Sequence, residues 1–182
     1  VIKICKGTFD KGVSINFHKP DEEVMVKADQ VQMEQVFLNL LINAEHAMTV
    51  MREDEAQRGG DIDIEISSEK VNKTQFPKAS PDENYWKIVI QDKGVGIKPE
   101  DMQKIFDPFL TTKIKSKGTG LGLAMVYNII DLHKGFVEAK SELDKGSTFT
   151  VYIPELQPEE SELEFSYDTH DLFLGDGWIL II

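Results

Sequence analysis

Apolar residues recur along this chain with two different periods, which predict where its strands and helices lie. Val13, Ile15 and Phe17 alternate with polar residues, the pattern of a strand with one buried face. The run Tyr85–Ile90 is apolar almost throughout, so we expect it to be a central strand. Strands are predicted at residues 12–18, 24–26, 61–71, 85–90, 136–141 and 147–153.

A helical period begins near Asp29 and continues to about Arg52. We expect Asp29 to be the N-cap of this helix and Gln32 to be its capping-box partner. One broad face of the helix is apolar, which predicts that it packs on the sheet. That face consists of Met33, Val36, Phe37, Leu40, Leu41, Ala44, Ala47, Met48 and Met51.

Two shorter helices are predicted after the central strand. Pro99 is well placed in the first turn of a helix over Glu100–Ile105. Another helix covers Leu121–Leu132, and Gly135 is its expected C-cap. The order β-β-α-β-β-α-α-β-β predicts an α/β (α+β) two-layer sandwich, with one mixed β-sheet covered on one face by helices.

Composition narrows the class of protein. The 182 residues include a single cysteine, Cys5, so no internal disulfide can form and a cytoplasmic setting is expected. We expect Cys5 to be a small buried residue near a strand edge. No apolar run approaches the roughly 20 residues that span a bilayer. Because the pattern starts in mid-element, we expect a fragment of a longer protein, and membrane anchoring of that parent stays open.

The net charge of −12 is unevenly distributed. Residues 155–182 contain eight acidic residues and no Lys or Arg, so the rest of the chain is only mildly acidic. An acidic chain disfavours non-specific nucleic-acid binding, and no nucleic-acid partner is expected. We predict one domain over residues 1–154, an acidic linker over 155–175 and a further short element over 176–182.

Glycines mark a candidate phosphate site. Gly118, Gly120 and Gly122 directly precede a predicted helix, whose N-terminal N–H groups attract anions. Lysines at 113, 115 and 117 add positive charge, although a flexible loop with incidental lysines is the plainer alternative. The segment lacks the Gly-Lys-Ser/Thr ending of a P-loop and the spacing of a dinucleotide fold.

Polar residues on the first helix and at the end of the central strand are candidates for nucleotide recognition. Asp92 either caps a turn or accepts a hydrogen bond from a base amino group. Asn39, Asn43 and His46 form a narrow stripe on the helix, where asparagine is unusual. The stripe either serves interhelical hydrogen bonds and solvent exposure, or holds Mg²⁺ and phosphate.

Four boxes in order carry a family resemblance: Asn39-x-x-x-Asn43, Asp92-x-Gly94-x-Gly96, Phe106-x-x-Phe109 and Gly118-x-Gly120-x-Gly122. They resemble the N, G1, F and G2 boxes of the GHKL superfamily, most closely the catalytic and ATP-binding domain of sensor histidine kinases. The resemblance covers roughly residues 12–154.

The resemblance implies a Bergerat-type fold that binds ATP and Mg²⁺. Asp92 would read the adenine amino group, and Asn43 would hold Mg²⁺ with Asn39 beside it, both in catalytic roles. Residues 110–118 would form a lid that nucleotide orders, and Thr148 would join Asp92 through water. The other implied nucleotide-binding residues are His46, Ala47, Gly94, Gly96, Ile97, Phe109, Thr111, Thr112, Lys113, Gly118, Thr119, Gly120, Leu121 and Gly122.

Two departures sharpen the expectation. Asn39 stands where ATPases of the superfamily carry a catalytic Glu, which favours phosphoryl transfer over hydrolysis. The four histidines, at 18, 46, 133 and 170, lack the setting of a phosphoacceptor. The expected partners are therefore a histidine-bearing dimerisation domain of the same protein and a receiver domain or response regulator. The fragment would be monomeric or weakly associated and its parent a homodimer.

Other readings stay open. A GHKL kinase acting on serine, and a nucleotide-binding module that regulates a partner without catalysis, share the same boxes. The apolar run Trp178–Ile182 resembles the first strand of a receiver domain, which implies a hybrid kinase. Alternatively, this run packs on the domain itself.

Overall fold

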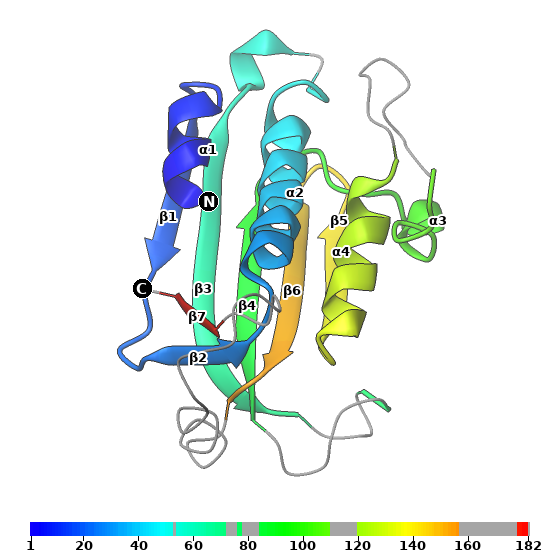
Figure 1. Ribbon diagram of the computed structural model, residues 1–182. Coiled ribbons are helices and arrows are strands. Elements are labelled where there is room, and N and C mark those ends of the chain that lie inside the picture. Colours follow the sequence, from blue (N-terminus) through cyan, green and yellow to red (C-terminus); the bar gives the residue numbers. More distant parts are fainter. Residues whose placement is uncertain (53, 72–75, 78–83, 110–119, 157–177, 182) are drawn as a thin grey trace.

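A computed structural model describes residues 1–52, 54–71, 76–77, 84–109, 120–156 and 178–181. Its centre is a five-stranded sheet in the order β1-β3-β4-β6-β5 (Figure 1). β1 is parallel to β3, whereas the other neighbouring pairs are antiparallel, so the sheet is mixed as predicted. The strands are β1 (Val13–His18), β3 (Gly60–Lys70), β4 (Asn84–Asp92), β5 (Phe136–Glu142) and β6 (Gly146–Pro154).

Helices lie on one face of this sheet (Figure 1). The long α2 crosses the middle of the sheet, with α1 on one side and α4 on the other. This arrangement confirms the predicted two-layer α/β fold. The helices are α1 (Ile2–Thr8), α2 (Gln30–Met48), α3 (Pro99–Met102) and α4 (Gly122–Leu132), with a short 3₁₀ turn η1 at Glu55–Gln57. None of the described helices is long and apolar enough to cross a membrane.

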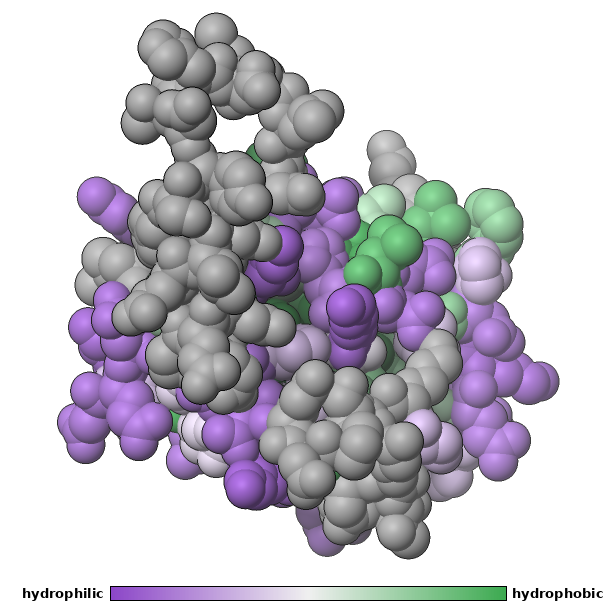
Figure 2. All heavy atoms as spheres, turned by 60° about the horizontal axis from the view of Figure 1, so that its bottom comes forward, coloured by the Kyte–Doolittle hydropathy of each residue, from purple (hydrophilic) through white to green (hydrophobic). Residues whose placement is uncertain are grey.

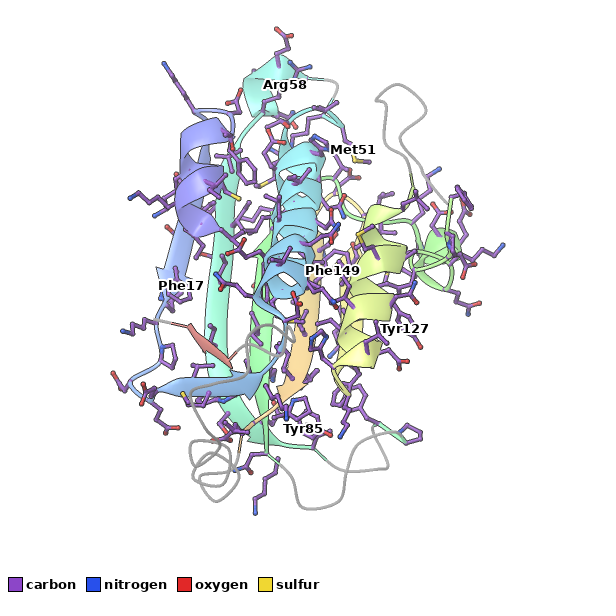
Figure 3. All side chains as sticks on the ribbon, in the orientation of Figure 1. Phe17, Met51, Arg58, Tyr85, Tyr127 and Phe149 are labelled. Carbon is purple, nitrogen blue, oxygen red and sulfur yellow. The ribbon has the colours of Figure 1, made fainter. Side chains whose placement is uncertain are left out.

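The core lies between α2 and the sheet. β4 is the middle strand, as its apolar sequence predicted, and its helix-facing residues Trp86, Ile88 and Ile90 are at most 2% exposed. Phe149 of β6 lies beneath the helices in the same layer (Figure 3). Full burial of a side chain of this size stabilises the fold by about 1.5–3 kcal/mol, so this layer fixes α2 on the sheet. α2 contributes Met33, Val36, Leu40, Leu41, Ala44 and Met48.

The other face of the sheet carries a smaller aromatic cluster. Phe76 stacks on Phe136 with ring centroids 3.9 Å apart, and Tyr152 lies 4.7 Å from Phe136. Tyr85 and Val71 complete the cluster, and Tyr85 marks the end of β4 far from Asp92 (Figure 3). The aromatic rings therefore cover only one end of this face.

The N-terminal helix α1 was not predicted. Its sequence includes Lys3, Lys6 and Gly7, and only Cys5 is buried, so no apolar stripe marks it. Cys5 lies in α1 and is fully buried, as predicted. Burial raises the pKa of its thiol.

The second predicted strand belongs to a separate sheet. β2 (Val24–Lys27) pairs antiparallel with β7 (Trp178–Ile181) and is not part of the main sheet. A pattern of buried and exposed residues gives a strand but not its neighbour, so this pairing could not be read from the sequence. Whether the run at the C-terminus begins a receiver domain stays a prediction.

Helix ends differ in detail from the predictions. The N–H of Gln32 donates to the Asp29 carboxylate, 2.8 Å away, which confirms the N-cap. α2 ends at Met48 and not near Arg52, and α3 ends at Met102. The left-handed residue after α4 is Lys134, with φ of 57°, so Gly135 is not the C-cap glycine. A Cβ on Gly135 would instead lie 2.2 Å from the carbonyl oxygen of Tyr152, which requires glycine there.

Candidate nucleotide-binding site

Asp92 ends β4 on the helix-facing side of the sheet and is only 3% exposed. One carboxylate oxygen accepts hydrogen bonds from the N–H groups of Gly94, at 2.8 Å, and Ser147, at 3.3 Å. Burial raises the pKa of this carboxyl, and the two N–H donors and the charge of Arg52 oppose that rise. Asp92 thus caps its own turn and is held in one orientation at the rim of the core.

Gly94 brings this turn against α2. A Cβ on Gly94 would lie 2.5 Å from the Cβ of Ala47 and 2.8 Å from its carbonyl carbon. The N–H of Val95 also donates to the Ala47 carbonyl, 3.1 Å away. The turn after β4 and the last turns of α2 are therefore in direct contact. This contact brings Asp92, the candidate adenine-binding residue, to the helix that carries the asparagine stripe.

Gly96 and Ile97 follow in the same loop after β4 and contact the end of β5. Gly96 has φ of 70°, and a Cβ there would lie 2.1 Å from the carbonyl oxygen of Glu142. The N–H of Ile97 donates to the hydroxyl of Ser141, 2.8 Å away, while its side chain packs on the core. Both residues bring the loop close to the end of β5, where the sheet ends.

A pair of serines supports Asp92. The Ser141 hydroxyl donates to the Gly146 carbonyl at 2.9 Å and lies 3.0 Å from the Ser147 hydroxyl. Ser147 is directly opposite Asp92 in the β4–β6 register, on the same face. Neither serine was among the predicted site residues. The alternation of β6 was the signal that could have found Ser147.

Thr148 requires a correction. It pairs with Gln91, so its side chain leaves the sheet on the face opposite to that of Asp92. Both residues do line a hollow of about 320 Å³ at the end of the sheet. We assign the place beside Asp92 to Ser147, because it shares the face of Asp92 and donates a backbone hydrogen bond to it.

The asparagine stripe of α2 faces the start of α4. Asn39 and Asn43 are half-buried, and a Cβ on Gly122 would lie 3.7 Å from the Asn39 amide carbon and 4.0 Å from the Asn43 amide nitrogen. The Asn39 amide also donates to the sulfur of Met125 at 3.9 Å. The structure therefore brings together the N box and the last glycine of the G2 box.

The start of α4 has the features of an anion site. Leu121 occupies the N-cap position, and no side chain of the described residues caps this helix. Gly120 has φ of 68°, and its carbonyl accepts the N–H of Phe109 at 3.0 Å. N–H groups at a helix N-terminus can bind phosphate oxygens.

The two phenylalanines of the F box have different environments. Phe106 packs on the core, and its ring centroid lies 5.9 Å from that of Tyr127 on α4. Phe109 is 76% exposed and has φ of 66°. In Figure 2 apolar residues of the described surface gather on the right, the side on which α3 and α4 lie. Phe106 therefore anchors this segment, while Phe109 is available for contact.

The remaining candidates are only partly placed. Nε2 of His46 lies 3.7 Å from a carboxylate oxygen of Glu45, on the same helix as Asn43. Five of the predicted residues, and the lid at 110–118, lie outside the described residues: Thr111, Thr112, Lys113, Gly118 and Thr119. The part of the chain that the structure describes contains no group of three or more His, Cys, Asp or Glu that could hold a metal ion. Amide oxygens of the stripe, together with nucleotide phosphates, fit Mg²⁺, which takes few protein ligands.

A larger cavity of about 390 Å³ lies elsewhere, between α1, α2 and the sheet. Its lining is mostly apolar, with Phe17, Met33 and Phe37 among the residues. It contains none of the candidate residues.

Comparison with known proteins identifies the family. The sequence pattern of the histidine kinase-, DNA gyrase B-, and HSP90-like ATPases matches residues 28–157. Sensor kinase CckA of Brucella abortus (strain 2308) is 41% identical over 138 residues, 74% of this chain and 14% of that protein. Sporulation kinase A of Bacillus subtilis (strain 168) is 34% identical over 143 residues, 79% of this chain and 20% of that protein.

Further matches agree in fold and family. Sensor histidine kinase ZraS of Salmonella typhimurium is 34% identical over 142 residues, 78% of this chain and 26% of that protein. The chain thus spans 14% to 26% of the length of these relatives. Among solved structures, the mycobacterial sensor histidine kinase MprB matches with a TM-score of 0.53 and 23% identity, covering 78% of this chain and 82% of that one. This family membership explains both the four sequence boxes and the fold. The chain is an ATP-binding domain of the histidine kinase-, DNA gyrase B- and HSP90-like ATPase family.

Proposed function

We propose that this domain transfers the γ-phosphoryl group of ATP to a histidine on the dimerisation domain of a two-component sensor kinase. The observation that carries the proposal is the contact between Gly94 and Ala47, which joins the buried Asp92 to the helix of Asn39 and Asn43. The similarity to proteins that are named as sensor kinases supports it.

Each wall of the site has a part in this mechanism. The Asp92 carboxylate accepts a hydrogen bond from the adenine amino group, with Ser147 and Gly94 keeping it in place. The N-terminal N–H groups of α4 would hold phosphate oxygens, and the amide of Asn43 would hold Mg²⁺ with Asn39 beside it. Bound Mg²⁺ would supply neutralisation of phosphate charge.

The chain's residues position the reactants and leave the bond-making to the partner. A histidine nitrogen forms the new bond to the γ-phosphorus as the bond to the bridging oxygen breaks, and ADP leaves with those electrons. Asn39, unlike a glutamate, cannot act as a base for water, so transfer to histidine is favoured over hydrolysis. In the parent, the phosphoryl group would pass on to a receiver domain or response regulator in the cytoplasm.

The experiment mixes this chain, a separate histidine-bearing dimerisation domain from the parent and ATP labelled at the γ-phosphate. Acid-labile, base-stable label on the dimerisation domain is the expected result. Acid-stable label would indicate a serine kinase. ATP binding without any labelled protein would indicate a regulatory module, and either result contradicts the proposal.

A further inference from the structure

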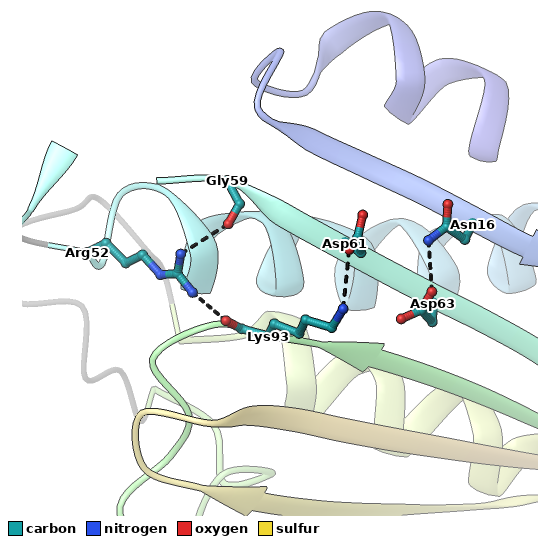
Figure 4. Close-up of polar contacts among 6 residues, drawn as sticks. All are labelled: Asn16, Arg52, Gly59, Asp61, Asp63 and Lys93. Atoms are coloured by element: carbon teal, nitrogen blue, oxygen red, sulfur yellow. Dashed lines mark hydrogen bonds and ion pairs between the residues drawn. The ribbon is translucent and has the colours of Figure 1, made fainter. Parts of the chain in front are cut away.

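Arg52 lies just after α2 and contacts three separate backbone carbonyls. One guanidinium nitrogen donates to the carbonyl oxygens of Gln57 and Gly59, the latter 3.1 Å away, and the other donates to the carbonyl of Lys93. Figure 4 shows the contacts with Gly59 and Lys93. A guanidinium has five donors in a planar fork and no acceptor, so it suits a set of convergent carbonyls. A lysine ammonium has no such fixed fork.

The three carbonyls belong to segments that frame the nucleotide site. Lys93 lies between Asp92 and Gly94, within the turn that carries Asp92, the candidate adenine-binding residue. Gly59 directly precedes β3, and its N–H donates to the carbonyl of Met48, the last residue of α2, at 2.9 Å. Arg52 therefore connects the end of α2, the start of β3 and the turn after β4.

Other contacts of Lys93 are weaker. Its ammonium lies 3.2 Å from a carboxylate oxygen of Asp61, but the two side chains are 58% and 45% exposed (Figure 4). Exposed ion pairs of this kind contribute little. The hydrogen bond from Arg52 holds the Lys93 carbonyl, and therefore the backbone of the turn, whereas the ion pair holds only the end of the Lys93 side chain.

We propose that Arg52 is a positioning residue for the nucleotide site, which fixes the Asp92–Gly94 turn relative to α2 so that the carboxylate meets the adenine amino group. This inference rests on the proposed function. It assigns adenine selectivity to a residue that lies outside all four sequence boxes.

The electrostatics of the site agree with this role. Burial raises the pKa of Asp92, and Arg52 is the charged group that lowers it, alongside the N–H groups of Gly94 and Ser147. A carboxylate that is kept ionised accepts the stronger hydrogen bond from an amino group. Arg52 thus influences both the position of the Asp92 turn and the ionisation of the Asp92 carboxyl.

The test compares Arg52→Gln with Arg58→Gln in the whole chain. Arg58 is a matched control, because it pairs with the exposed Glu55 in the same loop, 3.1 Å away. Dissociation constants are measured for ATP and for purine ribonucleoside triphosphate, which lacks the 6-amino group. Circular dichroism and thermal melting check that each variant is folded.

We expect Arg52→Gln to weaken ATP binding about tenfold or more, the loss that corresponds to a hydrogen bond to a charged group. Binding of the analogue should change much less, so the preference for ATP collapses. Arg52→Lys, which keeps the charge but not the fork, should recover part of the preference, and Arg58→Gln should match the wild type.

Two results would overturn the inference: an unchanged preference for ATP in Arg52→Gln, or an equal loss for both nucleotides. If Arg52→Gln does not fold, Arg52→Lys is the deciding variant. Wild-type ATP affinity and an unchanged preference for ATP over the analogue in Arg52→Lys would show that the guanidinium fork has no role. Failure of the wild type to bind ATP would instead contradict the proposed function.

Discussion

Nε2 of His133, at the end of α4, accepts a hydrogen bond from the backbone N–H of Asp29, 3.1 Å away at the start of α2. With Nε2 as the acceptor, Nδ1 is left to donate to the carbonyl of Ile129, 2.7 Å away. The expected capping box assigned the Asp29 N–H to Gln32, whereas the structure uses a histidine from another helix. The two helices that bear the N and G2 boxes are thus joined at their far ends.

His133→Ala should therefore destabilise the domain. Loss of the acceptor leaves a part-buried N–H unpaired, which costs about 1–3 kcal/mol of unfolding free energy. Urea denaturation measures the change. His18→Ala, at an exposed position, is the control and should change stability by less than about 0.5 kcal/mol. Equal stability of the two variants would show that the contact between helices contributes nothing.

Gly94→Ala should abolish nucleotide binding. The added methyl group meets Ala47 at 2.5 Å and the Asp92 carboxylate at 2.8 Å, so the turn must move away from α2. Calorimetric titration with Mg-ATP measures the loss. Gly7→Ala is the matched control, because among the described residues nothing lies within 4 Å of a Cβ there, and it should bind normally. Normal ATP affinity in Gly94→Ala would contradict the close contact.

Asp92→Asn should stabilise the free domain at neutral pH while removing ATP binding. Because burial raises the folded pKa of Asp92, ionisation costs stability as pH rises through the folded pKa, and the cost is absent below the unfolded pKa. The melting temperature of the variant should thus exceed that of the wild type at pH 7, and the difference should vanish in acid. Asp21→Asn, at an exposed position, serves as the control and should show neither effect.

Ser141→Ala should weaken ATP binding more than Thr148→Ala does. The Ser141 hydroxyl accepts the N–H of Ile97 and contacts Ser147, so its loss frees both the loop and the residue beside Asp92, at a cost of about 1 kcal/mol. Thr148 lies on the opposite face from Asp92 and should matter less. Dissociation constants from fluorescence titration would decide, and a larger effect at Thr148 would contradict the assignment to Ser147.

The sequence was most informative where its pattern is local. Alternation and one continuous apolar run located the strands of the main sheet, and helical spacing placed Asn39 and Asn43 on one stripe. The sequence pattern did not predict contacts between distant segments of the chain. The fork of Arg52, the bond from Asp29 to His133 and the pairing of β2 with β7 each join residues far apart in the chain, and no periodicity encodes them. Thr148 shows a second limit of sequence-based prediction. The motif predicted the correct end of β6, but only the strand register shows on which face of the sheet Thr148 lies.

The hollow beside Asp92 has a consequence for inhibitors. A compound that competes for this end of the site would meet two environments: a buried acceptor held by backbone N–H groups, and an exposed charged rim. The rim includes Lys140, Glu142 and Lys145, with the last two paired at 2.5 Å. A substituent directed at the rim would distinguish this domain from relatives that differ there, while a hydrogen-bond donor directed at Asp92 would supply affinity.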